Sequence, residues 1–415
     1  MGLNKKEILF FFGCSFFILT ASFARQIKVC PDCEIRSVQK AIDIAVDGDE
    51  IFIHPGVYKE HNIELTKSLT IKGIGNPVID GENKGTVFHI SSNNFSLQGI
   101  TIINVGKSFT KDFAGILVSR SSNFLIKNVV LKNVFFGILV EKSKHGNISY
   151  NKVSSNAVTE ASSGNGIHLW HCDHMQVDHN NLTGLRDGIY FEFVKESKIF
   201  KNHSYKNLRY GLHFMFSNNN AYYDNEFVSN GVGVAVMFSK FIDMRNNLFT
   251  ENWGSASYGL LLKEIYDAKI ENNRFTTNTV GVSVDGSTRV NFEGNTFARN
   301  GWAINVIGAC YENTFTGNNF MHNSFDLAHN GNVNSNRFEK NYWSDYTGYD
   351  LDGNGIGDVP YRPVKLFSYI TNRSPEAIIL LRSLFVDIIN FSEKVSPIFT
   401  PDNLLDPNPL MSPGR

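Results

Sequence analysis

The sequence has little proline, almost no net charge and no long apolar run beyond its first residues. Only 11 of its 415 residues are proline, and 39 Lys and Arg against 40 Asp and Glu give a formal net charge of −1. This balance provides no basic surface excess, so we expect no nucleic-acid partner. No segment after the N-terminus reaches the ~18 apolar residues of a membrane span. Instead, 34 glycines, 34 phenylalanines and many asparagines favour strands and turns.

The first residues have the features of an export signal. Two lysines precede an apolar run over residues 8–19, and "SFA" at 22–24 provides a small-residue cleavage site. We expect residues 1–24 to be a cleavable signal peptide and the mature chain to reside in the periplasm. The alternative, a lipoprotein modified at Cys14, is less favoured because the apolar run continues past this cysteine.

A repeat of about 22 residues organises the middle of the chain. Its signature is a glycine followed by apolar residues at the next and third positions, as in "GILV" and "GIHL". The signature recurs at Gly115, Gly137, Gly166, Gly188, Gly211, Gly233, Gly259 and Gly281, with a degenerate copy at Ala303. Asparagines recur in phase with it, in one series from Asn151 to Asn295 and in a second from Asn156 to Asn300.

A unit of three short strands cannot bury its own apolar face, so successive units must stack. We therefore predict an all-β, right-handed parallel β-helix of about ten rungs, with its core in residues 86–340 and asparagines bonded along the turns. Residues 25–85 supply a capping helix and the first rungs. Residues 341–373 form an Asp/Gly-rich loop and the final rung. Residues 374–415 supply one amphipathic helix, starting at Ser374 and Pro375, and an extended tail.

The repeat register places outward side chains in vertical columns. Rungs lie ~4.8 Å apart, so Met237 lies one rung after Met215 and Glu192 one rung before it. His213 lies on the same strand as Met215, and His168 lies two rungs before His213. Thioethers beside imidazoles favour Cu(I). We predict a labile copper site at these five residues on a solvent-exposed face. The alternative is a Met-rich and aromatic patch for a protein partner.

The loop "DLDGNGIGD" spaces oxygen ligands like the start of a Ca²⁺ loop. Asp350, Asp352, Asn354 and Asp358 alternate with glycines, although an EF-hand would need a glutamate where Tyr361 stands. The sequence leaves two interpretations open, a calcium site and a turn held by Asx hydrogen bonds.

Four cysteines remain after signal cleavage. Cys30 and Cys33 form "CPDC", which in an exported protein is a local disulfide or a metal-holding pair. Cys172 falls where other repeats have serine, so we expect it to be structural.

Many β-helix proteins cleave or epimerise polysaccharides, and the alternative function is such an enzyme or a polysaccharide-binding protein. Such chemistry needs convergent carboxylates in an exposed groove. The predicted outward face of the middle rungs has a single carboxylate, that of Glu192. We therefore expect a protein without enzymatic activity.

Several segments closely resemble the NosD family. They are "NGIHLWHC", "GIYFEF", "RYGLHFMFS", "GVGVAVMFS", "NYWSDYTGYDLDGNGIGDVPYRP" and "LLDPNPLM". The resemblance implies a periplasmic accessory protein for maturation of nitrous oxide reductase, which helps deliver copper together with an ABC transporter. The implied partners are the transporter's membrane subunit, the apo-reductase and a copper-donor lipoprotein. We expect the transporter contact on the C-terminal helix and tail, because the helix is very apolar and prolines keep the tail extended.

Overall fold

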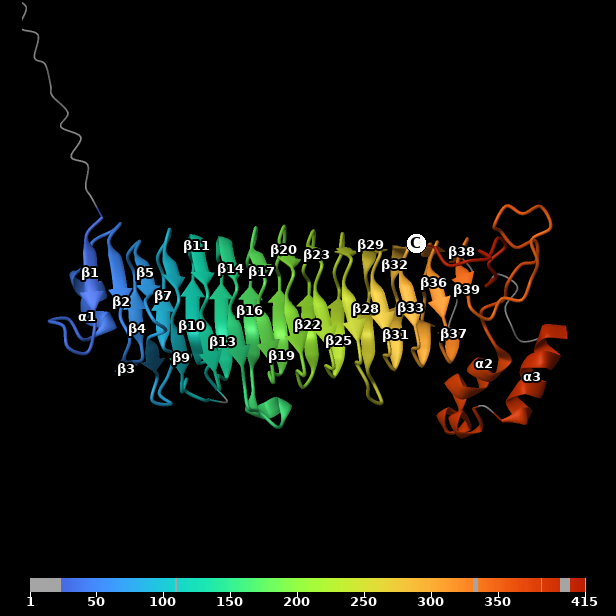
Figure 1. Cartoon of the computed structure of the whole chain (residues 1–415), viewed down its shortest axis with the longest axis horizontal. Coiled ribbons are helices and arrows are strands. Elements are labelled where there is room, and N and C mark those ends of the chain that lie inside the picture. The colour runs from blue at the N-terminus through green and yellow to red at the C-terminus, as the bar shows by residue number, and fades with distance from the viewer. Residues whose placement is uncertain (1–23, 109, 331–334, 382, 396–403, 415) are drawn as a thin grey trace, which may run out of the picture.

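Three parallel sheets run the length of the molecule and enclose one continuous apolar core. The computed structural model describes residues 24–108, 110–330, 335–381, 383–395 and 404–414. The predicted signal peptide, with Cys14, lies outside these residues except for Ala24. Strands follow one another along the long axis from β1 at the blue end to β39 near the red end (Figure 1), and each coil passes from one sheet to the next.

The strands of the first sheet are β1 (Gln26–Val29), β2 (Glu50–Ile53), β5 (Thr70–Gly73), β8 (Ser96–Gln98), β11 (Ser122–Lys127), β14 (Lys144–Ser149), β17 (Gln176–Asp178), β20 (Lys198–Phe200), β23 (Ala221–Tyr223), β26 (Asp243–Arg245), β29 (Tyr266–Glu271), β32 (Thr288–Glu293), β35 (Thr314–Thr316) and β38 (Arg337–Glu339). Those of the second are β4 (Ile63–Leu65), β7 (Phe88–Ile90), β10 (Ala114–Ser119), β13 (Phe136–Glu141), β16 (Asn165–Trp170), β19 (Asp187–Glu192), β22 (Tyr210–Met215), β25 (Val232–Met237), β28 (Tyr258–Lys263), β31 (Val280–Asp285), β34 (Trp302–Ile307) and β37 (Phe325–Asn330). Those of the third are β3 (Val57–Lys59), β6 (Val78–Asp80), β9 (Thr101–Ile103), β12 (Val130–Lys132), β15 (Lys152–Ser154), β18 (Asn181–Thr183), β21 (His203–Tyr205), β24 (Glu226–Val228), β27 (Leu248–Thr250), β30 (Arg274–Thr276), β33 (Thr296–Ala298), β36 (Asn319–Met321) and β39 (Tyr342–Trp343).

This architecture confirms the predicted right-handed parallel β-helix, but the predicted number of rungs is too low. The sheets have 14, 12 and 13 strands in the described chain, against about ten rungs expected. The turns that the prediction missed lie at the two ends. There β4, β7 and β37 have no glycine in front of their apolar residues, so the repeat signature does not mark them.

The glycine of the repeat signature is required by the close approach of the next rung. A Cβ atom on Gly188 would lie 2.6 Å from the carbonyl oxygen of Gly211, and one on Gly211 would lie 2.6 Å from that of Gly233. Both distances are too short for any side chain. The glycine column therefore lets successive coils of the second sheet stack at strand spacing.

Asparagine ladders hold the turns in register, as predicted. At most steps the backbone N–H and the Nδ2 group of one asparagine both donate to the Oδ1 of the asparagine on the next rung. Asn202 donates in this way to Asn225, with both N···O distances at 3.0 Å. The second ladder repeats the pattern between Asn207 and Asn230. Because these groups are buried, the ladders satisfy donors that would otherwise be left without partners.

Inside the coil, aromatic rings stack from rung to rung. One column of rings continues from Phe227 to Trp343, and its neighbouring centroids lie 4.0–5.4 Å apart. The filled interior leaves no room for a ligand there, so any site must lie on the outside.

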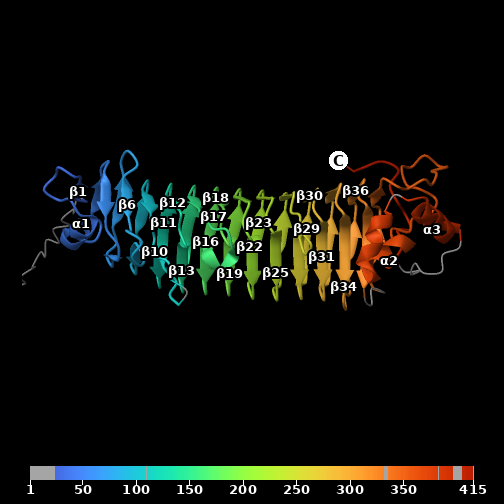
Figure 2. The same ribbon diagram turned by 90° about the horizontal axis from the view of Figure 1, so that it is seen from below.

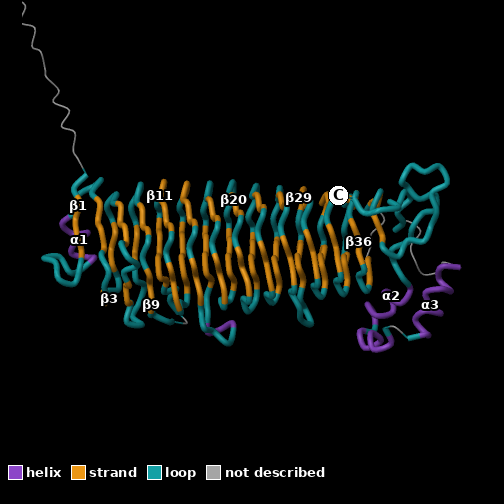
Figure 3. The backbone as a smooth tube through the Cα atoms, in the orientation of Figure 1, coloured by secondary structure: helices purple, strands orange, loops and turns teal. Residues whose placement is uncertain are grey.

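The N-terminal end is covered by a helix, as predicted. Helix α1 (Val38–Ile44) buries Val38, Ala41 and Ile42 against the first coil. Its N-terminus is held by Ser37 and by Glu60, whose carboxylate accepts hydrogen bonds from the N–H groups of two first-turn residues. A short 3-10 helix, η1 (Glu160–Ser162), lies in the loop before β16 (Figure 3).

The C-terminal end differs from the single long helix that we predicted. Helix α2 (Leu366–Arg373) comes first, in a segment predicted to be loop. The 3-10 helix η2 (Pro375–Leu380) and helix α3 (Leu384–Val395) follow. Ser374 ends α2, its N–H donating to the Ile370 carbonyl, and the backbone leaves helical geometry again at Leu381. These two breaks divide the apolar segment into pieces that pack beyond β37 (Figure 2).

The C-terminal tail returns to the last coil and closes it. Asp406 is fully buried, and its carboxylate accepts from the backbone N–H and Nδ2 of Asn341 and from the indole N–H of Trp343, at 2.9–3.1 Å. Asp406 therefore occupies the position that the next asparagine of the ladder would take. Residues 404–414 are thus part of the end cap, whereas the sequence suggested an extended docking tail.

We predict that Asp406→Ala loosens the last coil while leaving the middle coils intact. The change removes the acceptor of several buried N–H groups, each worth about 1–3 kcal/mol when left unpaired. Hydrogen-exchange mass spectrometry should show faster exchange over residues 337–345 and unchanged exchange around Asn225. The matched control is Asp112→Ala at an exposed position. Unchanged exchange over residues 337–345 would contradict this role of Asp406.

Candidate functional site

The predicted outward columns exist on the second sheet. Register pairs Tyr190 with His168 on one side and with His213 on the other. It also pairs Met215 with Glu192 and with Met237. The structure therefore brings the two methionines together on adjacent rungs, with Glu192 next in the same column. His168 and His213 stay two rungs apart, separated by Tyr190.

The expectation that His213 faces solvent is wrong. His213 is only 6% exposed. The rings of Tyr190 and Tyr210 lie 4.8 and 4.6 Å from its imidazole, and these large neighbours cover it. Sequence alternation shows that a side chain points outward from the coil, but it does not show what covers the outer face.

A buried acid beside His213 was missed by the sequence analysis. Asp187 is fully buried, and the guanidinium of Arg209 donates to both of its oxygens, at 2.9 and 2.5 Å. The Nδ1 atom of His213 lies 3.6 Å from the same carboxylate. Burial alone would raise the pKa of Asp187, but the neighbouring His213 and Arg209 outweigh it and lower this pKa. A usable signal was present, because "RDG" and "RYG" place an arginine at the same phase of successive rungs.

Buried ring nitrogens of the two imidazoles make no hydrogen bond to the described part of the chain, although Nδ1 of His213 faces the Asp187 carboxylate at 3.6 Å. Among the described residues, Nε2 of His168 and both ring nitrogens of His213 have no hydrogen-bond partner. Burial lowers the pKa of His168 to about 4, so its ring is neutral at neutral pH. A neutral imidazole is the form that binds metals.

Tyr190 links the imidazole column to the methionine column. Its hydroxyl lies 3.6 Å from the sulfur of Met215. Burial, with the nearby charge of Glu192, raises the pKa of Tyr190 to about 12. The phenol therefore keeps its proton, and its O–H group donates a hydrogen bond to the sulfur of Met215.

An aromatic ridge borders the methionines. It consists of the stacked rings of His171, Phe193, Phe216 and Phe238, whose neighbouring centroids lie 4.6–5.3 Å apart. Phe216 directly follows Met215, and Phe238 directly follows Met237. Phe193 and Phe216 are about two-fifths exposed. An apolar ridge beside a cluster of unpaired nitrogens and thioethers can combine metal binding with protein contact.

Comparison with known proteins finds relatives of this chain. Residues 149–348 match a family described as "Periplasmic copper-binding protein (NosD)". Two relatives, each named "Probable ABC transporter binding protein NosD", come from Stutzerimonas stutzeri and Pseudomonas aeruginosa. The first is 23% identical over 88% of this chain and 87% of its own, the second 26% over 84% and 85%. The chain is NosD-like.

Solved structures support the fold of this NosD-like protein. A double mutant of the periplasmic alginate epimerase AlgG superposes with a TM-score of 0.53 at 12% identity, over 71% of this chain and 76% of its own. At this identity the likeness shows a shared β-helix and nothing about activity. In the described part of the chain, none of the helices is long and apolar enough to cross a bilayer.

The acidic loop of the NosD-like chain is built from Asx turns. The carboxylate of Asp350 accepts from the N–H groups of Gly353, Asn354 and Gly355, and that of Asp358 accepts from Leu351. These bonds lower the pKa of Asp350, the one from Gly355 most. Within the described residues, the ligand oxygens predicted for Ca²⁺ at Asp350, Asp352 and Asp358 do not form a compact metal-binding group. The contacts support the turn interpretation.

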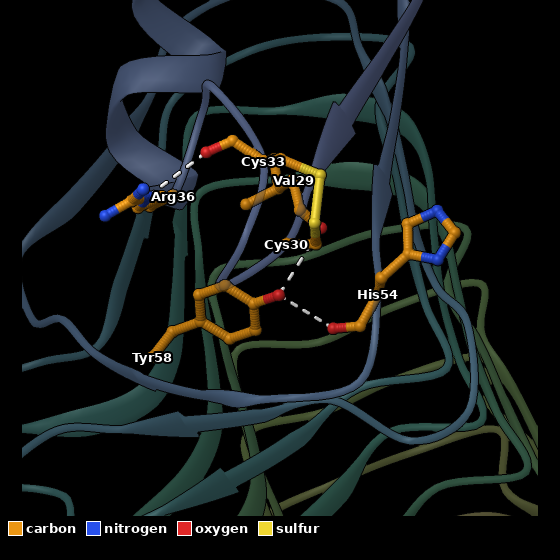
Figure 4. The surroundings of a disulfide bond; sticks show 6 residues. All are labelled: Val29, Cys30, Cys33, Arg36, His54 and Tyr58. Carbon is orange, nitrogen blue, oxygen red and sulfur yellow. Dashed lines mark hydrogen bonds between the residues drawn. A yellow bond between two sulfur atoms is a disulfide. The ribbon is translucent and has the colours of Figure 1, made fainter.

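The structure distinguishes disulfide-bonded from free cysteines. Cys30 and Cys33 form a disulfide beside β1 (Figure 4), which decides between the two interpretations of "CPDC". Nearby, the hydroxyl of Tyr58 donates to the carbonyls of Val29 and His54. Cys172 is a buried free thiol, as expected, and burial raises its pKa to about 12.

We predict that His168 makes the protein less stable in acid. Its folded pKa of about 4 lies below the unfolded value of about 6.5. The unfolded chain therefore binds the proton first as pH falls, and stability decreases between pH 6.5 and 4. From pH 7 to pH 5 the loss attributable to His168 is about 2 kcal/mol.

Urea unfolding of the wild type and His168→Gln at both pH values measures this loss. The variant should lose less stability than the wild type over the interval. His203→Gln serves as the control, since this histidine is more exposed and pairs with Glu226. Equal losses in the wild type and His168→Gln would contradict the prediction.

Proposed function

We propose that this protein is a periplasmic accessory factor in the maturation of nitrous oxide reductase, which assists copper delivery together with an ABC transporter. The family description and the names of both relatives support the general role. The observation that carries the copper proposal is the direct register pairing of Met215 with Met237, beside His213. The apo-reductase and a copper-donor lipoprotein are the proposed exchange partners, and the protein itself performs no catalysis.

The proposed copper ligands are Met215, Met237 and His213, with Glu192 and His168 beside them. Thioether and imidazole ligands suit Cu(I). The Nδ1 of His213 lies toward Asp187, which leaves Nε2 as its metal-binding atom. Uncharged thioethers hold copper weakly enough for transfer, and the adjacent aromatic ridge offers a surface for the receiving protein.

The polysaccharide alternative has less support. Asp187 is the acid that the structure adds to the outer face, but it is fully buried and both of its oxygens are occupied by Arg209. The accessible carboxylates that remain in this part of the methionine column are Glu192 and Glu141, which lie two rungs apart with Trp170 between them. General acid–base cleavage of a sugar bond uses two carboxyl groups on either side of that bond.

We predict that replacing both Met215 and Met237 with leucine abolishes tight Cu(I) binding without unfolding the protein. Leucine keeps the apolar volume and removes the sulfur. Competition with a chromophoric Cu(I) chelator should show at least ~tenfold weaker binding, equal to about 1.4 kcal/mol. Met321→Leu, on the third sheet, is the matched control. Unchanged copper affinity of the double variant would contradict the Cu(I) site and favour a protein-docking surface at these columns.

The proposed transporter contact is the outer face of α3. Leu384, Ile388, Phe391 and Val395 follow one another at helical spacing and are 55–74% exposed. The opposite face holds Val386, which packs on Phe325 and Phe367. An apolar stripe on a helix anchored from behind is suited to a groove or to a membrane-embedded partner. Because residues 404–414 belong to the end cap, we place the contact on α3 rather than on the tail.

We predict that combining Leu384→Ser with Phe391→Ser reduces co-purification with the transporter's membrane subunit and leaves copper binding unchanged. The loss is expected because the changes remove two large apolar side chains, Leu384 at the start of the stripe and Phe391 within it. Val158→Ser is the matched control, because Val158 is 86% exposed on a distant loop. Full co-purification of the double variant would exclude α3 as the contact.

A further inference from the structure

Two histidines lie one above the other at a turn away from the methionine columns. His145 and His174 occupy equivalent turn positions on neighbouring rungs, both with left-handed backbone, φ 53° and 52°. Their ring centroids are 4.9 Å apart. Other rungs place Asn94 and Asn123, or Glu196 and Asn219, in the same column, and these pairs also contact vertically.

Asp173 completes this pair. Its Oδ1 lies 2.9 Å from Nδ1 of His174, and its backbone carbonyl accepts from the N–H of His145 at 3.2 Å. The ligand atoms of the three residues all lie within 4.8 Å of one another, the one group of this kind among the described residues. The parallel pairing of the two rungs holds all three residues at this separation.

We propose that His145, Asp173 and His174 form a surface site for a borderline divalent cation of the Zn²⁺ type. Two imidazoles and one carboxylate are ligands that zinc prefers, and three protein ligands leave a position open for water or a partner's group. The ligand set contains no sulfur, so its chemistry differs from the proposed Cu(I) site. The proposal does not depend on the role of the protein in copper delivery.

The site is reachable from solvent. His145 and His174 are exposed, and the ion pair of Asp173 among the described residues is with His174, not with a lysine. Asp173 also lines a shallow surface hollow with Lys142 and Lys144. The positive charge of these lysines lowers cation affinity, so binding is best measured at physiological salt, which screens them.

The molecule contains a natural control for this site. His179 also follows an aspartate, and its Nδ1 lies 2.7 Å from Asp178. The residue stacked on His179 from the neighbouring rung is Tyr150, at 4.4 Å, where the proposed site has a second histidine. The two turns share a His–Asp pair and differ in the third ligand.

Isothermal titration of the mature protein with ZnCl₂ tests the proposal. The expected result is one Zn²⁺ bound, with affinity reduced about tenfold or more by His145→Asn, His174→Asn or Asp173→Asn. Asparagine is used for the histidines because it tolerates left-handed backbone. His179→Asn should leave binding unchanged, and the Met215→Leu, Met237→Leu double variant should also retain it.

Two results would overturn the proposal. One is Zn²⁺ binding by His145→Asn and His174→Asn that equals the wild type. The other is a loss in His179→Asn as large as in His174→Asn, which would mean that any His–Asp pair on this surface suffices. A second variant, Tyr150→His, should add a Zn²⁺ equivalent by supplying the missing imidazole at the control turn, and failure to add one would count against the proposed geometry.

Discussion

The hydrogen-bonded contact between one rung and the next is the constraint on which the rest of the structure depends. It combines parallel backbone pairing, a glycine column that lets the coils approach, and asparagine ladders that tie each turn to its neighbour. Each asparagine satisfies buried donors of the preceding rung, so a single change affects two coils. The result is a rigid scaffold in which the vertical neighbour of any side chain is known.

Because the interior of this scaffold is filled, its binding sites must lie on the outer surface. The interior is filled with stacked phenylalanines, while the second sheet carries tyrosines, histidines and methionines outward. Tyr190 and Tyr210 bury His213 against the salt-bridged Asp187, so a polar cluster is formed outside the coil with little exposure to water. Burial of His168 in the same column lowers its pKa and keeps that imidazole neutral, because the low-polarity surroundings disfavour the protonated ring.

Sequence periodicity predicted the parts of the structure that repeat. The glycine and asparagine spacing was enough to assign the fold, the rung register and the pairing of Met215 with Met237, since these follow from local pattern and stacking. It could not predict the burial of His213 or the pairing of Asp187 with Arg209, because these depend on how large side chains cover a surface. The end cap was also missed: contact between Asp406 and Asn341 joins segments separated by 65 residues, and no repeat signals it.

The Asp406 carboxylate at the end of the asparagine ladder also affects whether copies of this protein can stack end to end. A ladder is directional, since the backbone N–H of each asparagine donates to the asparagine of the next rung toward the C-terminus. Its last member, Asn341, presents two N–H donors. An open last coil could pair with the first coil of another copy and continue as a fibre. Asp406 accepts those donors within the same chain, and α1 covers the opposite end. Closing both ends removes the open coil edges through which copies of the chain could otherwise stack end to end.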